Sequence, residues 1–163
     1  MDASNAFPAS VGQKFRYQKR GKVIQSLAVG NLHRRPVTMG RERSQIAARF
    51  KQLLKQDKIA FPAARESMVA PAGQGVYVIR DRREKVLHVG RTLRGKGGLH
   101  QRLYDHIYGR SSFVYQHLDG HGAKLRGTCT YQVLAEPNER LRALLEAHAI
   151  SQLCPAHLGT GSA

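Results

Sequence analysis

GVYVIRDRREKVLHVGRT, residues Gly75–Thr92, contains two short apolar runs that are rich in β-branched residues. The runs GVYVIRD and KVLHVGRT are joined by charged, polar residues that suit a turn. Two such runs with a short polar link predict a β-hairpin. A hairpin supplies at least one antiparallel pair of strands, so the remaining chain has to cover the sheet that this pair begins.

The chain after the hairpin supplies one more predicted strand and two helices. In LHQRLYDHIYG, Leu99–Gly109, apolar residues recur every fourth position and a glycine ends the pattern, which predicts a helix. TCTYQVLAE, Thr128–Glu136, predicts a third strand, and PNERLRALLEAHAISQLCP, Pro137–Pro155, predicts a helix with a proline at each end. The expected class is α+β, with a small three-stranded, mixed or antiparallel sheet flanked by helices.

The part of the chain before the hairpin is the more basic part. Residues 1–70 carry 14 Lys and Arg against 4 Asp and Glu, and their first half shows no sustained period. We therefore expect a basic N-terminal arm without regular structure. Residues 41–56 place apolar side chains on one helical face and cations such as Arg43 and Lys51 mostly on others. That helix either lies against phosphates or caps the core as a solvated helix.

Two domains are expected from these patterns. Residues 62–75 contain two prolines and two glycines before the first apolar run, which is typical of a linker. The arm and amphipathic helix then form residues 1–70, and a second domain spans residues 71–163.

Composition points to a polyanionic partner. The 163 residues carry a formal net charge of +16, more than solubility requires, and nucleic acid is the commonest cellular polyanion. No apolar stretch is long enough to cross a bilayer, so we expect no membrane partner. The two cysteines lack metal-ligand spacing and suit reduced thiols. The expected location is the cytoplasm, associated with the nucleoid in a bacterium.

The loop GRTLRGKG, Gly90–Gly97, is a candidate for binding phosphate. It differs by one residue from the phosphate loop of nucleotide hydrolases, because Gly97 stands where a Ser or Thr would hold Mg²⁺. The chain also lacks the parallel βαβ series that usually surrounds that loop. We therefore expect no nucleotide cofactor, although a nucleotide hydrolase stays open as a rival interpretation.

A second set of residues includes this loop and extends far beyond it. GVY at 75–77 and HVG at 88–90 lie on the predicted hairpin, followed by RT, by RLYDH, by Glu146 in the last helix and by Pro155. This ordered set, over about residues 73–158, resembles the GIY-YIG nuclease superfamily. The resemblance implies a small sheet flanked by helices and divalent-metal-dependent cleavage of DNA phosphodiester bonds.

The resemblance implies that Tyr77 activates the nucleophilic water. A phenol is a poor base at neutral pH unless a cation lowers its pKa, and Arg91 and Lys96 are the expected cationic neighbours. His88 stands where the family has a tyrosine, and an imidazole accepts a proton more readily than a phenol. The alternatives are a half-buried strand tyrosine and a packing histidine. The sequence leaves open which of Tyr77 and His88 is the base.

The predicted helices carry the remaining catalytic candidates. Arg102 and His106 lie one turn apart, where the guanidinium suits the scissile phosphate and the imidazole suits the same phosphate or the leaving oxygen. Glu146 would be the single carboxylate ligand of Mg²⁺ or Mn²⁺, with waters and phosphate completing the shell. Its alternative is a surface residue paired with Arg142. The family usually has an asparagine after the final proline, and here His157 stands nearby.

DNA contacts are expected from the glycine-rich loop and from the first helix. The predicted contacts are Gly90, Arg91, Arg94, Lys96, Arg43 and Lys51. Cutting both strands with one such site requires a homodimer or a second event, and the sequence displays no dimer interface. The first rival function is a nucleic-acid-binding module that keeps this fold without cleaving. Neither the target, nor the number of strands cut, nor the biological role can be read from the sequence.

Overall fold

The computed structural model of the chain describes residues 39–93 and 97–158, all of which belong to one compact unit, Arg35–Ala163. The predicted basic arm lies outside the described residues. None of the described helices is long and apolar enough to cross a membrane. The elements, in chain order, are α1 (Met39–Leu54), β1 (Ile59–Ala60), β2 (Gly75–Arg80), β3 (Val86–Arg91), α2 (Gly98–Ile107), α3 (Ser112–His117), a 3₁₀ helix (Gly122–Leu125), β4 (Thr130–Ala135) and α4 (Glu139–Leu153).

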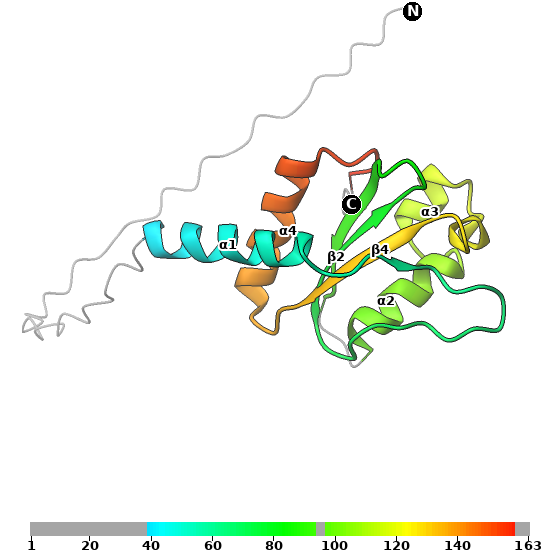
Figure 1. The fold of residues 1–163 in the computed structure, drawn as a ribbon, viewed down its shortest axis with the longest axis horizontal. Helices are drawn as coiled ribbons and strands as arrows, with labels where there is room; N and C mark the ends of the chain where they lie inside the picture. The colour runs from blue at the N-terminus through cyan, green and yellow to red at the C-terminus, as the bar shows by residue number, and fades with distance from the viewer. Residues whose placement is uncertain (1–38, 94–96, 159–163) are drawn as a thin grey trace, which may run out of the picture. The chain divides into compact units, whose positions relative to one another are not determined.

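The sheet has four strands in the order β1-β4-β2-β3, and each neighbouring pair is antiparallel (Figure 1). The α+β class is therefore confirmed, and the predicted hairpin is the pair β2–β3. The predicted count of three strands is wrong, because β1 adds a fourth. With only two residues, β1 is too short to show an alternating pattern, and its pairing with β4 alone defines it.

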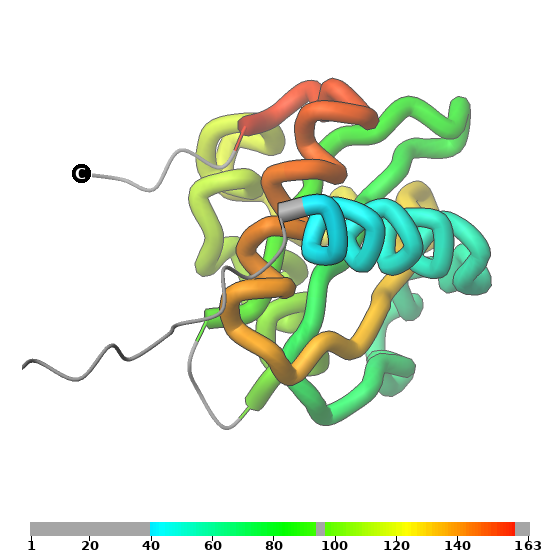
Figure 2. Tube along the Cα trace, turned by 90° about the vertical axis from the view of Figure 1, so that its left-hand side faces the viewer, coloured from blue at the N-terminus to red at the C-terminus, as the bar shows by residue number. Residues whose placement is uncertain are grey.

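The sheet separates two layers of apolar side chains. On one face, α2 and α3 pack on the first layer, which contains Tyr77, Leu103 and Phe113. On the other face, α1 and α4 pack on the second layer, which contains Leu53, Val78 and Leu145. Figure 2 shows α1, in cyan, crossing α4, in orange, on this second side. Consecutive residues of β2 point to opposite faces, so each strand contributes to both layers.

Helix α1 caps the core, as one of the two interpretations of the sequence predicted. Leu53 is fully buried, and Phe50 packs against the same layer. Arg140 of α4 donates two hydrogen bonds to the Glu42 carboxylate near the start of α1. The domain boundary that we predicted near residue 70 therefore falls inside one compact unit, in a stretch without helix or strand between β1 and β2.

The segment after α4 lies along the outer edge of β3. Ala156 and His157 donate backbone hydrogen bonds to the carbonyl oxygens of Val86 and Leu87, at 3.0 and 2.9 Å. His157 thereby forms an isolated parallel bridge with His88. A sheet edge presents unpaired backbone groups, and this segment satisfies two of them. It also brings a residue from the end of the described chain to the first face of the sheet.

Candidate functional site

The phenol of Tyr77 is the centre of the polar cluster on the first face. Tyr77 is fully buried on β2, and its Oη lies 2.8 Å from His106 Nε2 and 3.2 Å from Arg102 Nε, which donates to it. The Nε2 atom of His88 lies 3.5 Å from the same oxygen. Four of the residues predicted for catalysis are thus in direct contact.

Strand register places the glycine of the second motif against this phenol. Gly90 on β3 is the partner of Tyr77 across the hairpin. A Cβ atom at residue 90 would overlap with the phenol oxygen and would lie 3.0 Å from His88 Nε2. We predicted Gly90 as a phosphate contact, but it is buried and leaves room for the phenol.

Helix α2 delivers Arg102 and His106 from one face, as their spacing predicted. His106 is fully buried, and its Nδ1 lies 2.7 Å from Ser111 Oγ. Ser111 is the N-cap of α3, and its Oγ also accepts a hydrogen bond from the backbone N–H of Val114. His106 therefore lies behind the phenol, and both of its ring nitrogens have protein partners.

His88 belongs to a second chain of contacts that leads away from the phenol. Its Nδ1 lies 3.3 Å from His157 Nδ1, and His157 Nε2 lies 2.9 Å from Gln116 Oε1 on α3. The His88 ring stacks on Phe113 with a centroid distance of 4.7 Å and an interplanar angle of 6°. This stacking and the bridge to His157 fix the imidazole from two sides.

Glu146 of α4 and Arg91 of β3 form an ion pair, with Oε2 and Nε 2.7 Å apart. Burial raises the pKa of the Glu146 carboxyl, while Arg91 and Arg102 lower it. The predicted alternative pairing with Arg142 is wrong. Arg142 is buried and donates instead to the carbonyl oxygens of Thr92, Glu136 and Pro137.

Burial controls protonation around the phenol. It raises the pKa of Tyr77 to about 12, against the lowering effect of Arg102 and in the same direction as Glu146. Burial also lowers the pKa of His88 to about 3 and holds that of His106 well below its ordinary value. We expected Arg91 to lower the pKa of the phenol, but Arg102 is the cation in contact, and burial outweighs it. The phenol and both imidazoles are uncharged at neutral pH.

The predicted DNA contacts are spread over the molecule. Arg43 and Lys51 are exposed on α1, and Arg91 is half-buried in its pair with Glu146. Arg94 and Lys96 lie outside the described residues. A pocket of about 130 Å³ lies beside Arg102, and Thr92, Leu93, Gly97, Gly98, Gln101 and Asp105 complete its lining.

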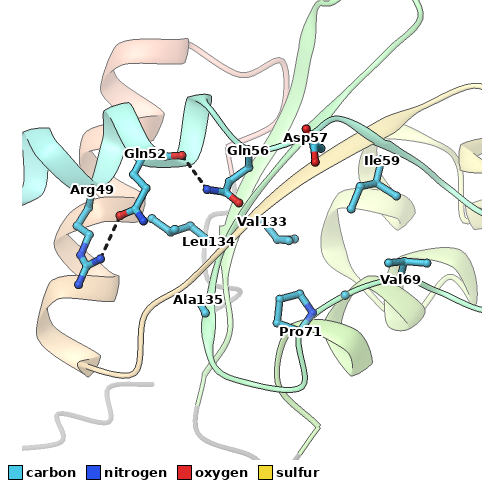
Figure 3. Close-up of a pocket in the computed structure, with 11 residues that line it drawn as sticks. Arg49, Gln52, Gln56, Asp57, Ile59, Val69, Pro71, Val133, Leu134 and Ala135 are labelled. Atoms are coloured by element: carbon cyan, nitrogen blue, oxygen red, sulfur yellow. Dashed lines mark hydrogen bonds between the residues drawn. The ribbon is translucent and has the colours of Figure 1, made fainter.

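A larger pocket, of about 580 Å³, lies away from the phenol between α1, β4 and residues 69–71 (Figure 3). Arg49, Gln52 and Gln56 line its α1 side, where Gln52 accepts hydrogen bonds from both of the others. None of the residues that we predicted for catalysis lines it.

Ligands for a metal ion are sparse among the described residues. Across residues 39–93 and 97–158, no group of three or more His, Cys, Asp or Glu side chains is arranged to hold a metal ion. Glu146 and Asp105 both raise the pKa of Tyr77, and Arg102 lowers the pKa of Glu146. One carboxylate completed by waters and a phosphate suits Mg²⁺ or Mn²⁺ better than a metal that prefers nitrogen or sulfur ligands.

Three contributors to the cluster are absent from the predicted set of site residues. Ser111 carries a signal in the sequence, because a serine directly before a helix is a typical N-cap. Gln116 carries none, since only the packing of α3 brings it near His157. His157 was considered only as a stand-in for the asparagine that the family usually has after the final proline, with the absence of that role as the alternative.

Comparison of the chain with models of known protein families, with curated proteins and with solved structures gives no match.

Proposed function

We propose that the protein is a GIY-YIG-type endonuclease that hydrolyses DNA phosphodiester bonds. One observation carries this proposal: Tyr77 of β2 contacts Arg102 and His106 of α2, and Glu146 of the distant α4 interacts electrostatically with Tyr77 and Arg102. Phosphodiester hydrolysis needs a group that activates water, a cation that neutralises the phosphoryl oxygens and a site for a divalent ion. The cluster contains a candidate for each role.

Glu146 is the residue that would hold Mg²⁺ or Mn²⁺. Its carboxylate is half-buried, and burial raises its pKa, so the ionised form needs a nearby positive charge. Arg91 supplies that charge in this structure, and a metal ion would supply it in place of Arg91. The bound ion would supply stabilisation of negative charge on the phosphate and the leaving oxygen. Because Glu146 is paired with Arg91 in this structure, the Arg91 side chain would have to move away before a metal ion could bind the carboxylate.

Proton transfer would proceed through the phenol. Tyr77 Oη takes a proton from the attacking water while its own proton passes to a neighbouring imidazole. The resulting hydroxide attacks phosphorus, the bond from phosphorus to the leaving oxygen breaks, and that oxygen takes a proton from solvent. Burial lowers the pKa of both neighbouring imidazoles, so each is neutral at neutral pH and has an unprotonated nitrogen, but the same shift makes each a weaker base than an ordinary histidine.

Arg102 serves both the phenol and the substrate in this proposal. Its Nε donates to Tyr77 Oη, and the residue also lines the pocket of about 130 Å³. A guanidinium has five N–H donors in a planar fork, so donation from Nε leaves the terminal nitrogens for a phosphate. The exposed cations of α1 would supply sequence-independent grip on the duplex.

A plasmid-nicking assay tests the proposal. We expect nicking that requires Mg²⁺ or Mn²⁺, stops with EDTA and is lost in Glu146→Gln. Asp119→Asn is the matched control, because Asp119 is an exposed acid in the turn after α3 with a long contact to Lys124. Nicking by Glu146→Gln at the rate of the unmodified protein would refute the metal site.

The second candidate is a nucleic-acid-binding module that does not cleave. Two observations favour it: the side chain of Tyr77 is fully buried, and the carboxylate of Glu146 is paired with Arg91. Salt-sensitive DNA binding without nicking under any metal would support this candidate. ATP turnover without nicking would instead support the nucleotide-hydrolase interpretation of the glycine-rich loop.

A further inference from the structure

We infer that the hydrogen bonds of the cluster run in one direction, from Val114 to Gln116, and that His88 rather than His106 is the acceptor of the Tyr77 proton. In this arrangement Ser111, His157 and Gln116 are positioning residues that set the tautomers of the three imidazoles. The inference deepens the proposed function and rests on it, because it assigns the proton acceptor in that same site.

One end of the chain of contacts begins at a backbone donor. The N–H of Val114 can only donate, so Ser111 Oγ accepts there with one lone pair, and its hydroxyl proton is available for His106 Nδ1, 2.7 Å away. His106 then carries its proton on Nε2 and donates it to Tyr77 Oη at 2.8 Å. A neutral imidazole donates from one nitrogen and accepts at the other, so this tautomer satisfies both contacts.

The other end is fixed by an amide oxygen. Gln116 Oε1 can only accept, so His157 carries its proton on Nε2, and its Nδ1 is an acceptor. That acceptor faces His88 Nδ1 at 3.3 Å, which places the proton of His88 on Nδ1. His88 Nε2 is then unprotonated, and it points at Tyr77 Oη from 3.5 Å.

The two ends meet at the phenol and agree there. Tyr77 Oη accepts from Arg102 Nε and from His106 Nε2, and its own proton has one remaining acceptor, His88 Nε2. Each neutral group then donates once along the chain, and hydrogen bonds aligned in this way polarise one another. Two donors aimed at the phenol oxygen stabilise the negative charge that develops there when the proton leaves. A hydroxyl oxygen accepts two hydrogen bonds, so one of these donors has to give way before the phenol can take the proton of the attacking water.

The contact of 3.5 Å between Tyr77 and His88 is long for a hydrogen bond. Catalytic hydrogen bonds are often long without substrate and shorten when the reactive complex forms. His88 is held for such a contact by its stacking on Phe113 and by its bridge to His157. His88, the residue that departs from the family motif, is therefore positioned to accept the proton of the phenol.

The direct test is the tautomer of each imidazole, measured by ¹⁵N NMR of the full chain near neutral pH. We expect a proton on Nδ1 of His88 and on Nε2 of His106 and of His157. Gln116→Lys replaces the acceptor by a donor and should reverse the tautomers of His157 and His88. Gln116→Glu keeps an acceptor and should leave them unchanged. Gln116 is exposed, so neither change threatens folding.

Nicking kinetics provide the second readout. We expect Gln116→Lys to lower kcat about tenfold without the same change in KM, since it removes one aligned proton acceptor. Tyr115→Lys is the matched control, because it adds the same charge at the neighbouring position, where the side chain is 75% exposed.

The two proposals fail in different ways. A protein that nicks DNA but carries the His88 proton on Nε2 would overturn the inference and keep the proposed function. Equal kcat for Gln116→Lys and Tyr115→Lys would overturn it as well. The expected tautomers in a protein that never nicks would uphold the direction of the chain and refute the nuclease.

Discussion

At the residue scale, the phenol of Tyr77 is controlled more by its surroundings than by its intrinsic acidity. Desolvation raises its pKa to about 12, although the guanidinium of Arg102 lies 3.2 Å away and acts in the opposite direction. A buried phenol of this kind carries no charge before reaction, so it functions by exchanging one proton for another. That exchange depends on the two imidazoles beside it.

Replacing Tyr77 by Phe should separate the role of the hydroxyl from that of the ring. The variant keeps the buried ring but removes the partner of Arg102 and of His106, and a buried polar group without a partner costs about 1–3 kcal/mol. We expect a loss of that size in urea unfolding, together with the loss of nicking. Tyr115→Phe, at a position that is 75% exposed, should change neither quantity. Unaltered nicking by Tyr77→Phe would exclude the phenol from proton transfer.

Gly90→Ala should damage the site through packing alone. The added methyl group would overlap with the Tyr77 hydroxyl, and overpacking in a buried region typically costs about 1–3 kcal/mol. We expect lower thermal stability and slower nicking. Gly73→Ala is the control, because a Cβ at residue 73 meets nothing within 4 Å. Equal melting temperatures for the two variants would contradict the observed fit between residue 90 and the phenol.

At the scale of elements, the sequence predicted the main helices and strands within a few residues, because each has a clear period or a clear end. The hairpin appears as β2 and β3, and α4 begins after Asn138, whose side chain caps the Leu141 N–H. Strand β1 and the bridge at His157 were missed, since both exist only through pairing with distant strands. Local pattern carries no information about such partners.

Leu53→Ala tests whether α1 is part of the folded unit. Leu53 is fully buried in the layer between α1, α4 and the sheet, so truncation should cost about 2–5 kcal/mol in the free energy of unfolding. Leu54→Ala, at the next position with 38% exposure, should cost clearly less. The comparison is made by urea unfolding of the full chain. A helix that stood apart from the sheet would give two equally small changes.

At the scale of the whole molecule, the buried histidines link stability to pH. The folded forms of His88 and His106 have pKa values below the ordinary value of 6.5, so the unfolded chain binds more protons than the folded chain in acid. Stability should therefore fall as the pH drops from about 6.5 toward about 3, the value to which burial lowers the pKa of His88. Glu146 acts in the opposite direction at pH values just above the ordinary pKa of a glutamate. Its raised pKa lets the folded chain hold this proton where the unfolded chain has lost it.

Urea midpoints measured between pH 8 and pH 4 should show this loss on the acid side. His88→Asn should make the pH dependence shallower, because one proton-linked group is removed. His121→Gln is the control, because His121 is exposed in the turn before the 3₁₀ helix. A midpoint that stays constant down to pH 4 would contradict the burial of neutral imidazoles in the solution structure.

The net charge of +16 should appear as a salt-dependent affinity for DNA. If α1 lies against the phosphates, Arg43→Gln and Lys51→Gln should each reduce the slope of log K against log salt by about 1. Lys124→Gln, in the 3₁₀ helix that packs with the opposite layer, should leave the slope unchanged. Fluorescence anisotropy with a labelled duplex at several salt concentrations measures the three slopes.

The sequence by itself determined the α+β class, the hairpin, the helical spacing of Arg102 and His106, and the basic charge, because these properties depend on local period and on composition. Only the tertiary structure decided that Glu146 pairs with Arg91, that Gly90 makes room for a phenol, and that His157 reaches His88. Each of these contacts joins residues brought together by strand register and by layer packing. Burial is also a property of the folded whole, so the protonation of Tyr77 and its imidazoles follows from the fold and not from the residue types alone.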